Sequence, residues 1–501
     1  MQQLSGLDAS FLSFETGNSP MHIAGVCLYD TSTATAPVTF DTYRDLVIRR
    51  LHVARTFRQR LVTVPLGLDR PYWVEDPDFD IDYHLRHLAL PKPGGWAELS
   101  AMTARLLSRP LDRTKPLWEM NFVEGLDSIP GLPPGSFATI TKVHHAAIDG
   151  VSGAEMLAAL LDITPEVRVV PEDKPWKPER IPTDREMLMR TLGGTLTSPV
   201  KFAGLLRDTL GSGVKFGTEL AKHRMKAPPV PFTAPRTRFN LPVSGARSWS
   251  GVMIDLDRVK RIKNAVEGAT VNDAILAIVS GGLRRYLQRH KDLPKESLVA
   301  FAPISVRPGE QKRAMGNQIS GMMVRLSTEE KNPVKRLSKI HDDAVQSKDY
   351  HRAVGASSLM NLSDFIPFAV AGLGARLYTG MEAAKRHNPV FNVVVTNVPG
   401  PQFPLYSGGA KLVTQFGAGP VFDGLGLIIP IFSYNGTITV SATACRSLMP
   451  DMDAFMDDLR ESVDELDKAA SAVKPAKKKP VPAKAAKPKG RASKTAGATA
   501  A

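Results

Sequence analysis

Residues 140–153 read ITKVHHAAIDGVSG, and they hold the most informative pattern in the chain. An apolar, strand-like run leads into two adjacent histidines, His144 and His145, and then into Asp149 and Gly150. Adjacent side chains of an extended chain point to opposite faces, so one imidazole can face a cavity while the other packs inward. A loop could return Asp149 to the histidine turn, and Gly150 allows a close backbone approach.

This pattern leaves several roles open. A single histidine at a strand end is more often a structural residue than a catalytic one. The His-His pair followed by Asp-Gly makes the catalytic and the structural roles equally plausible. A metal role is weaker, because no third histidine or cysteine stands at ligand spacing, and we expect no metal site.

The surrounding chain divides into four parts. Residues 1–185 and 243–470 each alternate strand-like and helix-like patterns, which predicts two mixed α/β halves. Residues 186–242 predict a basic amphipathic helical bridge that ends in a Pro-rich linker. Residues 471–501 form a Lys/Ala/Pro-rich tail that we expect to be disordered.

The net charge of +14 is concentrated in that tail, which holds nine basic residues and no acidic one. Without those nine, the remaining chain carries only +5. Such a tail binds anionic lipid or nucleic acid through charge alone, so we expect no specific nucleic-acid function.

Other classes of protein are disfavoured. Two cysteines exclude a disulfide framework, and the N-terminus lacks the pattern of a signal peptide. The uncharged run 424–445 contains Asn435-Gly436, which predicts a β-hairpin rather than a membrane helix. The sequence has no GxSxG elbow, Walker A motif or complete GxGxxG, so a serine nucleophile and a nucleotide cofactor have no support.

The HHxxxDG pattern resembles the signature of acyltransferases related to chloramphenicol acetyltransferase and to peptide-synthetase condensation domains. Further segments resemble the bacterial wax ester synthase/acyl-CoA:diacylglycerol acyltransferases in particular. These segments occur in order along the chain: LSGLDASFLSFETGNSPMHIAG (4–25), WVEDPDFDIDYHLRHLALP (73–91), PLDRTKPLWEM (110–120), TVNDAILAIVSGGLRRYL (270–287), PISVRP (303–308), GNQIS (316–320) and VVVTNVPGP (393–401).

The resemblance implies a mixed α/β (α+β) fold with two chloramphenicol-acetyltransferase-like halves and an active-site tunnel at their interface. It implies that His145 is the general base, that His144 supports the turn, and that Asp149 orients the site, with Arg307 as a candidate ion-pair partner. Asn272 either stabilises the reacting acyl group or caps a helix.

A second motif leaves its role open. Pro116, Leu117 and Trp118 resemble a motif associated with the substrate channel. The alternative is a Pro-started helix that packs Leu117 and Trp118 into the core.

The implied reaction is esterification of diacylglycerol to triacylglycerol with long-chain acyl-CoA as a substrate and no cofactor. Long-chain alcohols, which would give wax esters, are a second acceptor class. The implied location is cytoplasmic, peripherally attached to the inner membrane face or to lipid droplets, with the segment 188–226 as either a lipid contact or a packed bridge. The oligomeric state is unknown.

Two alternatives on the same fold remain. One is a condensation-type or polyketide-associated acyltransferase with another acceptor, and the other is a non-catalytic lipid-binding protein.

Overall fold

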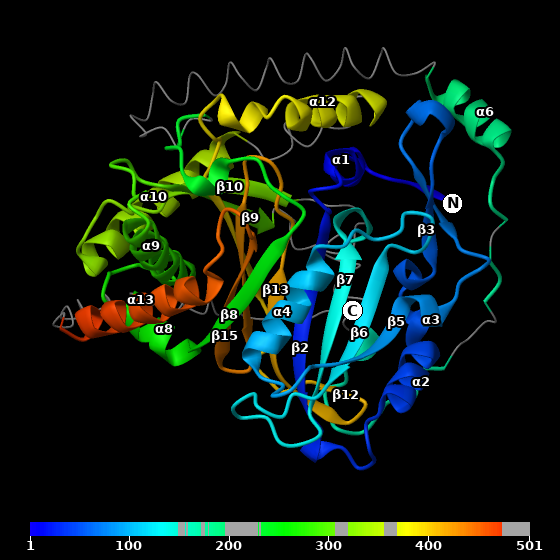
Figure 1. Cartoon of the computed structure of the whole chain (residues 1–501), viewed down its shortest axis with the longest axis horizontal. Coiled ribbons are helices and arrows are strands. Elements are labelled where there is room, and N and C mark those ends of the chain that lie inside the picture. Colours follow the sequence, from blue (N-terminus) through cyan, green and yellow to red (C-terminus); the bar gives the residue numbers. More distant parts are fainter. Residues whose placement is uncertain are drawn as a thin grey trace, which may run out of the picture.

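The computed structural model describes residues 1–148, 156, 159–171, 176–178, 180–195, 229, 232–305, 319–354 and 368–472. Two six-stranded sheets and one small three-stranded sheet organise these residues, with helices packed around them (Figure 1). This arrangement confirms the predicted mixed α/β class.

The first large sheet has the order β12-β13-β2-β7-β6-β5. Its strands are β12 (Tyr406–Ser407), β13 (Ala410–Ala418), β2 (His22–Asp30), β7 (Phe137–His144), β6 (Trp118–Glu124) and β5 (Leu85–Ala89). The nearby small sheet has the order β1-β4-β3, with β1 (Gln2–Gln3), β4 (Tyr72–Glu75) and β3 (Gln59–Val62). The accompanying helices are α1 (Gly6–Phe14), α2 (Phe40–Arg50), α3 (Ile81–His84), α4 (Trp96–Leu107) and α6 (Asp184–Thr195).

The second large sheet has the order β10-β9-β11-β14-β15-β8. Its strands are β10 (Ile319–Arg325), β9 (Val299–Ser305), β11 (Val393–Pro399), β14 (Leu427–Tyr434), β15 (Thr437–Cys445) and β8 (Arg247–Asp255). Its helices are α8 (Leu256–Lys263), α9 (Val271–Arg289), α10 (Pro333–Val354) and α13 (Met452–Ala472), while α12 (Phe368–Gly380) packs on α1.

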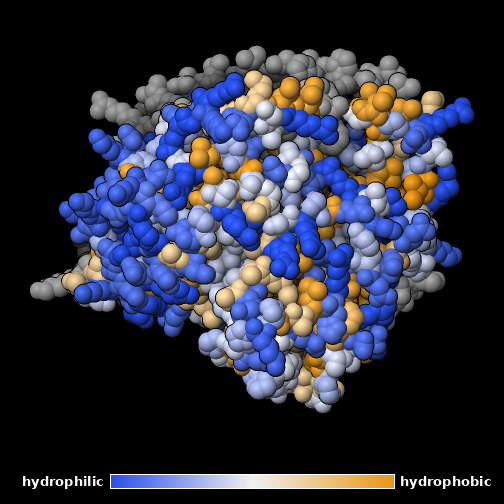
Figure 2. Space-filling model, viewed as in Figure 1, coloured by the Kyte–Doolittle hydropathy of each residue, from blue (hydrophilic) through white to orange (hydrophobic). Residues whose placement is uncertain are grey.

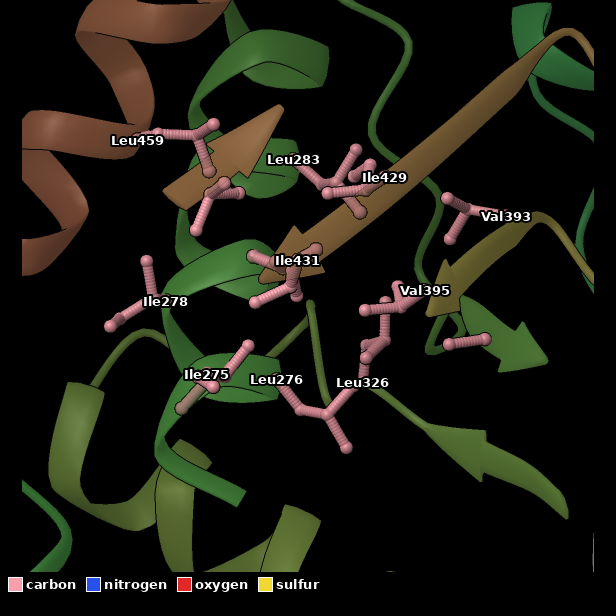
Figure 3. Close-up of a cluster of buried hydrophobic side chains, with 14 of the residues drawn as sticks. Ile275, Leu276, Ile278, Leu283, Leu326, Val393, Val395, Ile429, Ile431 and Leu459 are labelled. Atoms are coloured by element: carbon pink, nitrogen blue, oxygen red, sulfur yellow. The ribbon is translucent and has the colours of Figure 1, made fainter. Parts of the chain in front are cut away.

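The long helix α9 forms the centre of the second core. Figure 3 shows Ile275, Leu276, Ile278 and Leu283 of α9 among side chains of β11, β14 and α13. The helix begins with a capping box, in which the Thr270 side chain and Asp273 satisfy each other's backbone N–H groups. Residues 274–279 of this helix are buried on all sides, which explains why this stretch, AILAIV, is apolar throughout.

A strand from the C-terminal half belongs to the first sheet. β13 comes from the C-terminal part of the chain but pairs antiparallel with β2 of the first sheet, Lys411 opposite Asp30 and Ala418 opposite Ala24. A third core cluster therefore mixes residues from both parts, with Val26 and Ile140 beside Trp249 and Phe416. The four-part division of the chain stays a prediction. The pairing of β13 with β2 is a feature that this division does not include.

Local predictions can be compared directly with these elements. The hairpin predicted within 424–445 is β14 and β15, joined at Asn435 (φ 44°) and Gly436 (φ 84°), and this prediction is confirmed. Most of the segment 188–226 and the tail from residue 473 lie outside the described residues.

Candidate functional site

The two motif histidines lie where a buried strand ends. His144 is the last residue of β7, and His145 opens the short 3₁₀ turn η5 (His145–Ala147). β7 lies between β2 and β6, so the first sheet holds the turn from both sides. His144 is fully buried, whereas His145 is partly exposed, and the two imidazoles therefore have different surroundings.

His145 is held by its backbone and by the face of its ring. Its backbone N–H donates to the carbonyl of Met21 at 2.8 Å, and its ring stacks on Phe11 of α1 with 3.8 Å between ring centres. The Nδ1 atom is buried and has no hydrogen-bond partner. Burial lowers the pKa of His145 to about 4, and the nearby His144 adds to this effect, so the imidazole is neutral at pH 7 and can accept a proton.

His144 fixes the turn that carries His145. Its ring Nδ1 accepts the backbone N–H of Ala146 at 3.0 Å, and its backbone N–H donates to the carbonyl of Leu117 at 2.9 Å. Because Nδ1 acts as an acceptor, a neutral ring carries its proton on Nε2. That Nε2 lies 3.6 Å from Oε2 of Glu15, a charge-pair distance that is longer than a normal hydrogen bond.

Glu15, which our sequence analysis did not select, links this turn to α1. Its Oε2 accepts Nε of Arg113 at 2.6 Å, and its Oε1 accepts the N–H of Met21 at 3.4 Å. Burial opposes ionisation of Glu15, but His144 and Arg113 outweigh it and lower its pKa to about 2. Arg113 also donates to the carbonyl of Leu12, so one carboxylate ties together α1, the Met21 backbone and the histidine turn.

Further buried basic groups lie beside His144. His22 stands opposite His144 in the β2–β7 pairing, and its Nε2 lies 3.0 Å from the carbonyl of Leu107. Burial and the charges of Lys142 and His144 lower the pKa of His22 to about 3, so this ring is neutral and structural at pH 7. We assign it no chemistry.

Pro116, Leu117 and Trp118 are buried at the start of β6 and do not begin a helix. Trp118 donates from Nε1 to the carbonyl of Phe57 at 2.9 Å, and Leu117 accepts the His144 N–H. Pro116 and Trp118 also line a pocket of about 280 Å³. The three residues thus support the histidine strand, and their role in a substrate channel stays a prediction.

Asn272 does not cap α9, because Thr270 is the capping residue. The Oδ1 atom of Asn272 accepts Nδ2 of Asn397 at 3.3 Å, which joins the start of α9 to β11. The structure therefore removes the helix-cap alternative, while a role at the oxyanion stays a prediction. Asp149, Gly150 and Arg307 lie outside the described residues.

Two features of the described part of the chain bear on the class of site. Among those residues, no group of three or more His, Cys, Asp or Glu side chains could hold a metal ion. None of the described helices is both long enough and apolar enough to cross a membrane.

Comparisons with known proteins agree with this geometry. The fold and the histidine turn define a member of the two-lobed class to which chloramphenicol acetyltransferase belongs. The wax ester synthase/diacylglycerol acyltransferase catalytic domain matches residues 4–275, and the C-terminal domain of the same family matches residues 315–467. The chain belongs to the wax ester synthase/diacylglycerol acyltransferase family.

Two relatives cover most of the chain. A Mycobacterium tuberculosis (strain ATCC 25618 / H37Rv) protein with a provisional diacylglycerol O-acyltransferase name is 34% identical over 92% of this chain and 90% of its own length. The O-acyltransferase WSD of Acinetobacter baylyi is 32% identical over 92% of this chain and 96% of its own length.

Solved structures share the architecture. The wax ester synthase/diacylglycerol acyltransferase of Marinobacter aquaeolei VT8 superposes with a TM-score of 0.66 at 27% identity, covering 94% of this chain and 100% of that one. The first condensation domain of the CDA synthetase gives a TM-score of 0.52 at 17% identity, covering 94% of this chain and 97% of that one, which speaks for the fold alone. The predicted two-lobed fold is confirmed, and the tunnel stays a prediction.

Proposed function

We propose that this protein is an acyl-CoA-dependent O-acyltransferase that esterifies diacylglycerol to triacylglycerol, with His145 as general base. The observation that carries the proposal is the partly exposed His145, whose neutral ring stacks on Phe11 and whose backbone N–H donates to the Met21 carbonyl. The relatives' names support diacylglycerol as one acceptor class and long-chain alcohols, which yield wax esters, as a second.

The proposed reaction balances without a cofactor. The His145 imidazole takes the proton of the acceptor hydroxyl while that oxygen attacks the thioester carbonyl carbon. The tetrahedral oxyanion then collapses, the C–S bond breaks, and the imidazolium returns its proton to the departing CoA thiolate. Asn272 is our candidate donor to the oxyanion, a kind of contact worth roughly 2.7–4 kcal/mol in other enzymes.

We also propose roles for three residues outside the described part of the chain, as the family resemblance implies. Asp149 orients the histidine turn, Gly150 allows close approach, and Arg307 is the candidate partner of Asp149. The protein would act at the cytoplasmic membrane face or on lipid droplets as a peripheral enzyme.

The test uses purified full-length protein with palmitoyl-CoA and, separately, dioleoylglycerol or hexadecanol, following free thiol and lipid products. We expect ester formation with at least one acceptor and a loss of about 10²–10⁴-fold in His145→Ala. His87→Ala, at an exposed histidine of β5, is the matched control and should retain wild-type activity.

Two outcomes would redirect the proposal. Full CoA release by His145→Ala would show that His145 is not the general base, whereas no CoA release by the wild-type protein with either acceptor would favour a non-catalytic lipid-binding protein. Transfer from an acyl carrier protein but not from free acyl-CoA would favour a condensation-type enzyme.

A further inference from the structure

An exposed apolar stripe runs along α12. Leu373 and Leu377 lie one helical turn apart and are 58% and 54% exposed, and Met381 continues the stripe just after the helix. The Met381 N–H donates to the Leu377 carbonyl at 2.9 Å, so the helical spacing extends to that residue. Side chains four residues apart share one helix face, so three large apolar groups point to solvent together.

Apolar side chains are also exposed on two elements that α12 contacts. α12 packs against α1 and reaches the short turn η4 (Pro65–Gly67). Phe14 ends α1 with its side chain exposed, while Leu66 and Leu68 at η4 are 87% and 56% exposed. We call these six residues the apolar rim: Phe14, Leu66, Leu68, Leu373, Leu377 and Met381. Figure 2 shows hydrophobic side chains along the upper edge of the molecule, where Figure 1 places α12.

The rim is unusual because a helix this apolar is normally buried. α12 reads FAVAGLGARLYTG and holds one charged residue, the exposed Arg376. Exposed Lys385 and Arg386 follow the helix, and the neighbouring Glu382 is already paired with Lys385 at 2.6 Å. Guanidinium groups at the border of an exposed apolar helix face match an anionic lipid surface.

The rim also lies close to the proposed catalytic residue. α12 packs on α1, and Phe11 of α1 stacks on the ring of His145. A 13-residue helix is too short to span a bilayer, so it can contact lipid only by lying along the surface. Only α12 and α1 would then lie between a lipid surface and the His145 imidazole.

We infer that the apolar rim is the surface on which this protein docks to an anionic phospholipid membrane, so that a membrane-dissolved acceptor reaches His145 past α1. This inference rests on the proposed function for its acceptor, but the docking itself can be measured without any acyl transfer.

The experiment compares two double variants of the full-length protein in co-sedimentation with vesicles. Leu373→Glu/Leu377→Glu places two charges in the rim. Met253→Glu/Val345→Glu adds the same charge at exposed apolar positions of β8 and α10. Vesicles of phosphatidylcholine alone and of phosphatidylcholine with phosphatidylglycerol serve as probes.

We expect the rim variant to sediment with the mixed vesicles about tenfold less than wild type, because two exposed leucines lose their apolar contact. The control variant should sediment as wild type. Arg376→Gln should weaken binding only to vesicles that contain phosphatidylglycerol. With acceptor dispersed in detergent, the rim variant should keep wild-type acyl transfer, which separates a docking defect from a catalytic one.

Three results would overturn the inference. These are equal sedimentation of the rim variant and wild type, an equal loss in the control variant, or a wild-type dimer in solution that ignores vesicles and dissociates in the rim variant. The last would show that a second copy covers the rim. Vesicle binding without acyl transfer in detergent by wild type would instead refute the proposed function and leave the docking surface intact.

Discussion

A histidine that is neutral over a wide pH range is the residue on which the proposed chemistry depends. Burial lowers the pKa of His145 to about 4, so its base form predominates above that pH. We predict that kcat/KM falls on the acid side with an apparent pKa near 4 rather than near 6.5, and stays almost flat between pH 5.5 and 7. A pH–rate profile checks this, and an acid limb near 6.5 would contradict it.

The Glu15 carboxylate gives a second prediction at this scale. Its folded pKa of about 2 lies below the ordinary value of 4.5, so its contribution to stability is complete above pH 4.5 and is lost as pH falls towards 2. We expect Glu15→Gln to lower the free energy of unfolding by on the order of 3 kcal/mol at pH 7 and by progressively less at lower pH.

Urea unfolding at pH 7, 4 and 3 measures this difference. The control is Glu124→Gln, a half-exposed carboxylate beside His87, which should cost less than about 1 kcal/mol. If the free energy of unfolding lost in Glu15→Gln did not change with pH, the packing of the Glu15 side chain rather than its charge would account for its contribution.

Sequence patterns reveal some of these residues and miss others for a physical reason. His144 and His145 stand out because their neighbours in the chain make the pattern. Glu15 does not, because it meets His144 only after α1, β2 and β7 have packed. The sequence leaves Asn272 open as a helix cap, whereas in the structure Thr270 and Asp273, three residues apart, form the capping box.

Among single elements, the β14–β15 hairpin offers a clean test of backbone strain. Gly436 has φ of 84°, and a methyl group added there would meet no other atom within 4 Å. Gly436→Ala should therefore destabilise the protein by about 1–2 kcal/mol through the backbone alone. Thermal unfolding measures the loss. Gly17→Ala, at a position with equal space and no left-handed backbone, should leave stability nearly unchanged, and equal losses would contradict the strain argument.

Turns and helices were predictable because their signals are local. Asn435-Gly436 specifies a tight turn within two residues, and the apolar spacing of 40–53 matches α2 and the 3₁₀ turn after it. The order of strands has no such local signal. Nothing in the residues of β13 distinguishes a neighbour of β2 from a member of the second sheet, since both places require an apolar strand.

At the scale of the whole molecule, β13 joins the two halves, because it comes from the C-terminal half and pairs with β2 of the first sheet. Trp249 of β8 donates to the carbonyl of Gly417, and Trp96 of α4 donates to Ser250, so the shared core is also tied by hydrogen bonds. We predict one cooperative calorimetric transition for the full chain. Gly436→Ala should shift that whole transition, and two peaks of which one moves would contradict the prediction.

The position of β13 also sets an order of events on the ribosome. The edge of β2 that faces β13 cannot pair until residues 411–418 have left the exit tunnel, long after residues 24–30. Throughout most of translation the nascent first sheet therefore presents an open strand edge to other chains. Chaperone capture of this edge, or pausing before residue 418, would bear directly on the yield of native enzyme.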